Sequence, residues 1–143
     1  MIAEVRGAIA AACAARLPDA QCTAYVLANP TPPSLAVFPA GTEYDKAMAA
    51  YSAMGVRSGT DMLAFTIRAF VGTLTDQGAQ VLLDRMLEPS GGISIKEAVE
   101  LDGTLGGLVD DCSITSVSGY TQYQTENSGV LLGAEWTVQV LAG

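Results

Sequence analysis

The spacing of apolar residues at the start of the chain predicts a helix over residues 2–18. Its apolar side chains fall close to one helical stripe, formed by Ile2, Val5, Ile9, Cys13 and Leu17. Alanine, which favours helices, fills most of the other positions, and Pro18 ends the segment. Two short apolar runs then predict strands at residues 22–29 and 34–41, with a proline-rich loop between them. We expect the helix to pack on the sheet that these strands begin.

Alternation of side chains predicts a central strand at residues 61–72. One face carries Leu63, Phe65, Ile67 and Val71, and the other carries Met62, Thr66, Arg68 and Phe70. The stretch before it, residues 42–59, contains alanine and methionine without a regular period. That stretch is typical of a flexible connector or a hairpin arm.

Two helices are predicted after the central strand. The first lies within residues 75–89, with Thr75 as the expected N-cap and Pro89 as the stop. The second lies within residues 90–103 and begins with a capping box. In this motif, Ser94 and Glu97 are three residues apart, so each side chain can bind the backbone N–H of the other.

The chain closes with a predicted hairpin of two strands, residues 105–124 and 130–142. In the second strand, Trp136 points to the same side as Ala134, Val138 and Val140, and the opposite side carries Glu135, Thr137 and Gln139. We expect the Trp136 face to fill the core against the 61–72 strand and the two helices. We also expect the last strand to be an edge strand, which a neighbouring subunit covers. Truncation after Ser128 should therefore abolish folding.

The order of these elements favours the α+β class. Strands are mostly joined by hairpins, and the helices occur in two groups. We expect one domain over residues 1–143, with an antiparallel or mixed β-sheet packed on one face by α-helices.

The negative net charge argues against a protein that binds nucleic acid through a basic face. The formal net charge is −8, and the seven bases are scattered along the chain. Residues 76–111 contain eight acids and two bases. This cluster is either a solvated acidic face or a surface that repels DNA or attracts a basic partner.

The three cysteines do not have the spacing of a metal site, and their number is odd. Reduced, buried thiols in a cytoplasm are the expected state. No apolar run is long enough for a membrane span, so we expect no membrane partner.

The residues for common catalytic chemistry are missing from the sequence. The chain has no histidine, which removes the commonest general base and the commonest metal ligand. No nucleotide-binding glycine motif occurs. Asp102, Asp110 and Asp111 could gather a hard cation, but they also fit a solvated turn before a strand. We expect no enzyme activity and no cofactor.

Three stretches, read together, carry a resemblance to a known family. They are DMLAFTIRAFVG with AQVLLDRMLEPSG, SIKEAVELDGTLGGLVDDCSITSVSGYTQYQ, and the closing VLLGAEWTVQVLA. In this order they resemble the tail terminator proteins of long-tailed bacteriophages, in particular those of actinobacterial phages. The resemblance runs from about Tyr44 to Ala142, and LDGTLGG followed by GAEWTVQV is its most specific part.

This resemblance implies a structural protein of the virion, assembled in the host cytoplasm and placed at the head–tail junction. Its subunits would form a hexameric ring on the tail tube protein, stop tube growth and join the head-side connector. DNA would pass through the ring without specific binding.

Two groups of residues are candidates for contacts in such a ring. For the subunit or tube interface they are Met48, Tyr51, Met54, Arg57, Tyr120, Tyr123, Glu135 and Gln139. For an acidic lumen they are Glu97, Glu100, Asp102, Asp110 and Asp111. The methionine-rich part of the first group fits an adaptable contact surface and, equally, a loop folded back on its own core. Both tyrosines of the hairpin also fit simple packing.

Two other functions remain open from the sequence. One is a head-completion or neck connector ring protein, which differs in the partner that it binds. The other is a cytoplasmic small-ligand-binding domain or a histidine-free hydrolase, which would be a monomer or dimer with a ligand-sized pocket.

Overall fold

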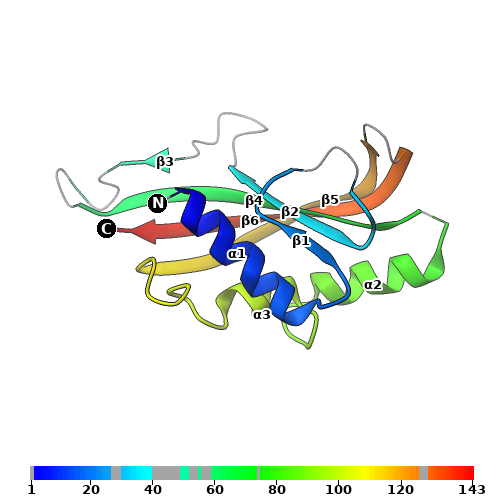
Figure 1. The fold of residues 1–143 in the computed structure, drawn as a ribbon, viewed down its shortest axis with the longest axis horizontal. Coiled ribbons are helices and arrows are strands. Elements are labelled where there is room, and N and C mark those ends of the chain that lie inside the picture. Colours follow the sequence, from blue (N-terminus) through cyan, green and yellow to red (C-terminus); the bar gives the residue numbers. More distant parts are fainter. Residues whose placement is uncertain are drawn as a thin grey trace.

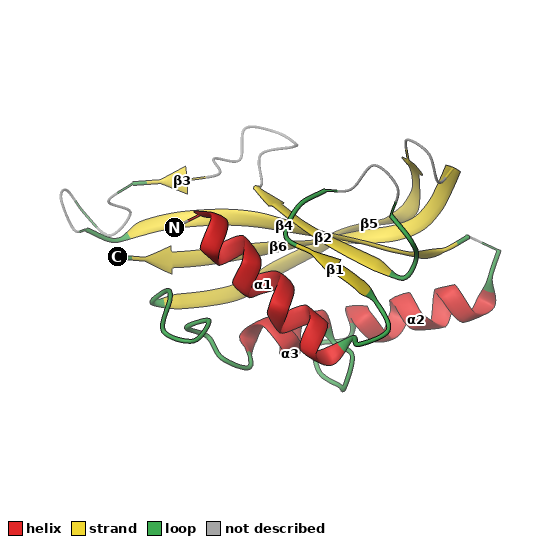
Figure 2. Cartoon of the chain, in the orientation of Figure 1, coloured by secondary structure: helices red, strands yellow, loops and turns green. Residues whose placement is uncertain are grey.

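A twisted β-sheet with three helices packed on one face forms the fold of the described residues (Figures 1 and 2). The computed structural model describes residues 2–26, 30–39, 49–51, 55, 59–73, 75–125 and 129–143. Its elements are α1 (Ile2–Arg16), β1 (Gln21–Thr23), β2 (Ser34–Pro39), β3 (Ala49–Ala50), β4 (Asp61–Gly72), α2 (Gln77–Leu87), α3 (Ile95–Glu100), β5 (Asp111–Thr125) and β6 (Gly129–Ala142). No helix in these ranges is long and apolar enough to cross a membrane.

The described strands lie in the order β1-β2-β4-β6-β5, and β3 pairs with β4 beside β2. The β1–β2 pair is parallel, and the other pairs are antiparallel. The predicted α+β class with a mixed sheet is therefore confirmed. The last strand, however, is not an edge: β6 pairs with β4 on one side and with β5 on the other. The expectation of an open last strand was wrong, because a long-range pairing with β4 covers the side of β6 that the hairpin leaves free.

One cluster of buried side chains joins all three helices to the sheet. Trp136, Phe65 and Ile67 are fully buried at its centre, and Trp136 is the cross-strand partner of Ile67. The helices contribute Val5 and Ile9 from α1, Leu83 and Met86 from α2, and Ile95 and Val99 from α3. This arrangement confirms that the Trp136 face fills the core against the central strand and the two helices.

The helix starts differ in detail from the predicted ones. Asp76, not Thr75, is the N-cap of α2, because its carboxylate accepts hydrogen bonds from the N–H groups of Gly78 and Ala79. At α3, Ser94 caps the helix by accepting from the N–H of Glu97 at 3.2 Å. The N–H of Ser94 donates to the Gly91 carbonyl at 3.2 Å, in place of the return bond to Glu97 that the capping box predicts.

The long strand predicted from residue 105 begins only at Asp111, because a turn precedes it. The Asp102 carboxylate accepts hydrogen bonds from the backbone and hydroxyl of Thr104 and from the N–H of Gly106. The Thr104 hydroxyl and then the two N–H groups lower the pKa of Asp102. Gly106 and Gly107 have φ values of 73° and 88°, which glycine adopts without strain. The segment LDGTLGG, part of the resemblance described above, is thus a turn that the Asp102 carboxylate stabilises.

Candidate interaction surfaces

The face of the sheet opposite the helices carries a cluster of four side chains on β4, β5 and β6. Arg68 pairs with Glu135, with 3.3 Å between Nη2 and Oε1. The Arg68 guanidinium also lies 5.2 Å from the centroid of the Tyr123 ring, and Phe70 meets the same ring edge-on. Tyr123 and Glu135, two predicted interface residues, thus lie together on this face.

The hydroxyl of Tyr123 donates a hydrogen bond to the carbonyl of Gly119 at 2.7 Å. Gly119 has a φ of 72°, and a Cβ placed on it would collide with the Tyr123 hydroxyl. The bond therefore ties the aromatic cluster to the irregular part of β5 between Ser118 and Thr121. Glycine suits this backbone conformation, and a side chain at this position would push the Tyr123 hydroxyl away from its bond.

The remaining predicted interface residues lie elsewhere. Gln139 is on the same face of β6 as Glu135, and its amide contacts Met62. Burial raises the pKa of Tyr120, and a hydrogen bond to Asp84 of α2 adds to this effect. Tyr120 thus reaches toward the helical side of the sheet, away from Tyr123. Tyr51 is highly exposed, and Met48, Met54 and Arg57 lie outside the described residues.

Two of the five predicted lumen acids are neutralised by bases of the same chain. Glu97 pairs with Arg16 at 3.0 Å, and Glu100 pairs with Lys96. Burial opposes ionisation of Glu100, but the hydrogen bonds from Lys96 and from the N–H of Ile114 lower its pKa overall. These two carboxylates hold the fold and add little net charge to a surface.

The other three acids, Asp102, Asp110 and Asp111, are exposed around the turn before β5. No group of three or more metal-ligating side chains occurs among the described residues, so the suggested cation site has no support there. Within the described ranges, these carboxylates carry the uncompensated charge of the predicted acidic group.

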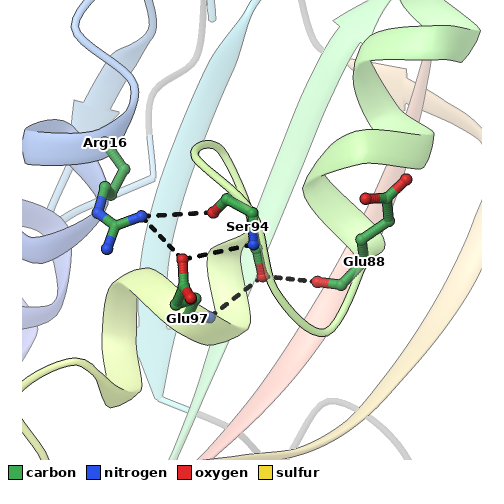
Figure 3. A network of polar contacts seen from close by, with 5 residues as sticks. Arg16, Glu88, Ser94 and Glu97 are labelled. Carbon is green, nitrogen blue, oxygen red and sulfur yellow. Dashed lines mark hydrogen bonds and ion pairs between the residues drawn. The ribbon is translucent and has the colours of Figure 1, made fainter.

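Glu97 takes part in a network that joins three elements (Figure 3). Its carboxylate accepts from Arg16 of α1 and from the N–H of Gly91, while Arg16 also reaches the carbonyl of Gly91. Ser94, which is fully buried, donates to the carbonyl of Glu88 just after α2. The network fixes α1 and the end of α2 to the start of α3, which is a structural role.

An apolar groove lies between α1 and α3 and was not found from the sequence. It has a volume of about 410 Å³, and its lining includes four alanines of α1 and the aliphatic side chains of Leu101 and Leu105. Leu101, just after the last residue of α3, is 70% exposed. The alanines, Ala8, Ala11, Ala12 and Ala15, recur at helical spacing and form a second stripe beside the core stripe. That stripe was a readable signal for a contact surface.

The outer edge of the sheet is formed by β5, a strand of 15 residues. Among the described strands it pairs with β6 only, and its residues from Thr115 to Gln122 are exposed. From Cys112 to Thr125 it contains no charged residue and no proline. Natural edge strands usually carry such residues because they prevent pairing with other chains. Two bulges, at Ile114/Ser116 and Ser118/Thr121, are the protection that this strand has.

The buried thiols offer no reactive nucleophile. Burial is the main cause that raises the pKa of Cys13 and of Cys112 to about 12, so both are protonated at neutral pH.

No protein-family model matches the sequence, and no curated protein compared with the chain matches it.

Proposed function

We propose that the chain is a structural virion protein, the tail terminator of a long-tailed bacteriophage. Its subunits form a hexameric ring that caps the tail tube, stops its polymerisation and joins the tail to the head connector. The observation that carries this proposal is the long, uncharged outer edge of the sheet at β5. A protein that works by assembly needs such a surface, and it needs no catalytic groups.

The sequence resemblance supports the same proposal from a different direction. Its three stretches cover β4 with α2, α3 with the turn and β5, and β6. These elements make the centre and one edge of the sheet together with two of the three helices. The resemblance thus concerns the body of the fold and the exposed edge, not an isolated motif.

Charge is consistent with passage of DNA through the ring. With a net charge of −8, the chain repels phosphates more than it binds them. We assign the lumen to the face that carries Asp102, Asp110 and Asp111, because these acids are exposed and have no basic partner in the contacts described above. Glu97 and Glu100 are assigned to the fold instead.

Electron microscopy of the protein mixed with polymerising tail tube protein tests the proposal. We expect ring-shaped particles with a central hole and tubes that stop growing once they carry a ring at one end. Tubes of unchanged length with bare ends would contradict it. Rings that bind the portal-side adaptor but ignore the tube would instead identify a head-completion or neck protein.

The groove between α1 and α3 favours one alternative, a small-ligand-binding domain. Its volume of about 410 Å³ lies in the range of ligand pockets. Its lining, however, is nearly all aliphatic, with Arg16 and Asp102 as the charged side chains. A thermal shift with small apolar acids or amines tests this function. A concentration-dependent rise in the melting temperature that Ala12→Leu abolishes would support it over the ring.

A further inference from the structure

The two edge strands of the described sheet carry almost no charged residues of their own. After its first residue, Asp111, the edge strand β5 lies in the uncharged stretch of residues 112–125, and the opposite edge strand β1 lies in residues 20–42, which are also uncharged. These are the two longest stretches of the chain without a charged residue. Just beyond β1, Tyr25 and Val26 are 54% and 61% exposed. The Arg6 guanidinium of α1 stacks on the Tyr25 ring and donates to the Ala24 carbonyl, so the charge at this edge comes from the helix. Apart from Asp111, neither edge strand carries a charge of its own that would oppose pairing.

We propose that copies of this chain join head to tail, with the β1 edge of one copy added to the β5 edge of the next. This inference rests on the proposed ring and names the contact that builds it. A contact between two different surfaces of one chain can repeat around a closed ring, whereas a contact of β5 with itself ends after two copies. The occupant of the β5 edge is thus a second copy of this chain.

Strand direction fits this arrangement. β5 runs parallel to β4 because both are antiparallel to β6, and β4 is antiparallel to β2. β1 is parallel to β2, so it runs opposite to β5. If the sheet continues from one copy to the next, β1 meets β5 as an antiparallel neighbour, which is the more stable pairing.

The register across the sheet brings the two edges to the same level. Thr23 pairs with Ala36, Ala36 with Arg68, Arg68 with Glu135, and Glu135 with Ser118. The level of β1 therefore corresponds to the irregular segment of β5 around Ser118, beside the exposed Val117. Nearer the start of β5, the N–H of Ile114 already donates to the Glu100 carboxylate. We assign the exposed part of the edge, from Val117 to Gln122, to a neighbour.

Two single substitutions test the two edges separately. Val117→Lys puts a charge on the β5 edge, and Val26→Lys puts one on the β1 edge. Val81→Lys on α2 is the matched control, because Val81 and Val117 are 41% and 42% exposed. Fluorescence of the buried Trp136 checks that each variant is folded. The readout is the mass of the full chain in solution, measured from micromolar to millimolar concentration.

We expect each edge variant to weaken assembly by about tenfold or more, because a buried lysine without a partner opposes association. The control should assemble like the native chain. A mixture of the two edge variants should form a one-to-one pair and nothing larger, because each supplies the edge that the other has lost. That pair is the signature of a head-to-tail contact.

Three results overturn the inference. They are a native chain that stays monomeric at millimolar concentration, a Val26→Lys variant that assembles normally, and a mixture that forms no pair. The proposed function fails separately. If both variants still form rings that cap the tube, the terminator function stands and the β1–β5 contact is wrong. If assembly depends on the two edges but the assemblies never cap a tube, the contact stands and the terminator function is wrong.

Discussion

Gly133 lies on β6 against the backbone of β4, and Gly133→Ala tests the spacing of the two strands. Gly133 pairs with Phe70, and a Cβ at this position would collide with the backbone carbonyl of Ala69 and press against the Phe70 ring. The obstacle is backbone in the middle of the sheet, so it cannot rotate away as the end of a flexible side chain can. The two strands must separate locally instead.

The cost follows from what that separation breaks. Two or three ladder hydrogen bonds are lengthened or lost, each worth about 0.5–1.5 kcal/mol. Together with the strain of overfilling the space beside Phe70, this gives a loss of about 2–4 kcal/mol in the free energy of unfolding. For a chain of this size, such a loss lowers the melting temperature by about 5–15 °C.

Urea unfolding followed by the fluorescence of Trp136 measures this loss, because Trp136 is the only tryptophan and is fully buried. The control is Gly7→Ala in α1, where a Cβ meets nothing within 4 Å. It should leave the midpoint unchanged or raise it, since alanine favours a helix over glycine by about 1 kcal/mol. An unchanged urea midpoint for Gly133→Ala would refute the described spacing of β4 and β6.

Three further predictions concern the core and its caps. Ser94→Ala should cost about 1–2 kcal/mol, because it removes the cap of α3 and the bond to the Glu88 carbonyl, while Ser90→Ala at an exposed position should cost little; equal urea midpoints would contradict it. Truncation after Ser128 removes β6 from between β4 and β5 and should leave no cooperative melt by circular dichroism, so a soluble, cooperatively melting fragment would contradict it. At pH 8, iodoacetamide should leave Cys13 and Cys112 unmodified until urea unfolds the chain, and rapid labelling of either thiol in the native protein would contradict this. The free energy of unfolding should also fall as the pH rises from about 9 to about 12, because these thiols ionise in the unfolded chain before they ionise in the folded one. An unchanged urea midpoint between pH 9 and pH 11 would contradict that expectation.

The sequence by itself determined the local elements and the residue types that the chain lacks. Periodicity identified the helix of residues 2–18, the central strand at 61–72 and the inward face of Trp136, because each is set by neighbours a few residues apart. The absence of histidine and the acidic balance needed no structure at all. The sequence named Tyr123 and Glu135 as interface candidates, but only the structure shows that both contact Arg68.

Only the tertiary structure decided which strands are neighbours and what the polar groups bind. Whether β5 or β6 forms the edge depends on which of them pairs with β4. The sequence does not decide this, because the backbone of any exposed strand can make such hydrogen bonds. Glu97 had the spacing to complete a capping box, but the folded chain brings Arg16 and the N–H of Gly91 to its carboxylate instead. The spacing of residues along the sequence shows which groups a side chain can reach within its own helical turn. The partner that it takes depends on groups brought near from distant parts of the chain, and charge and burial then favour one of them.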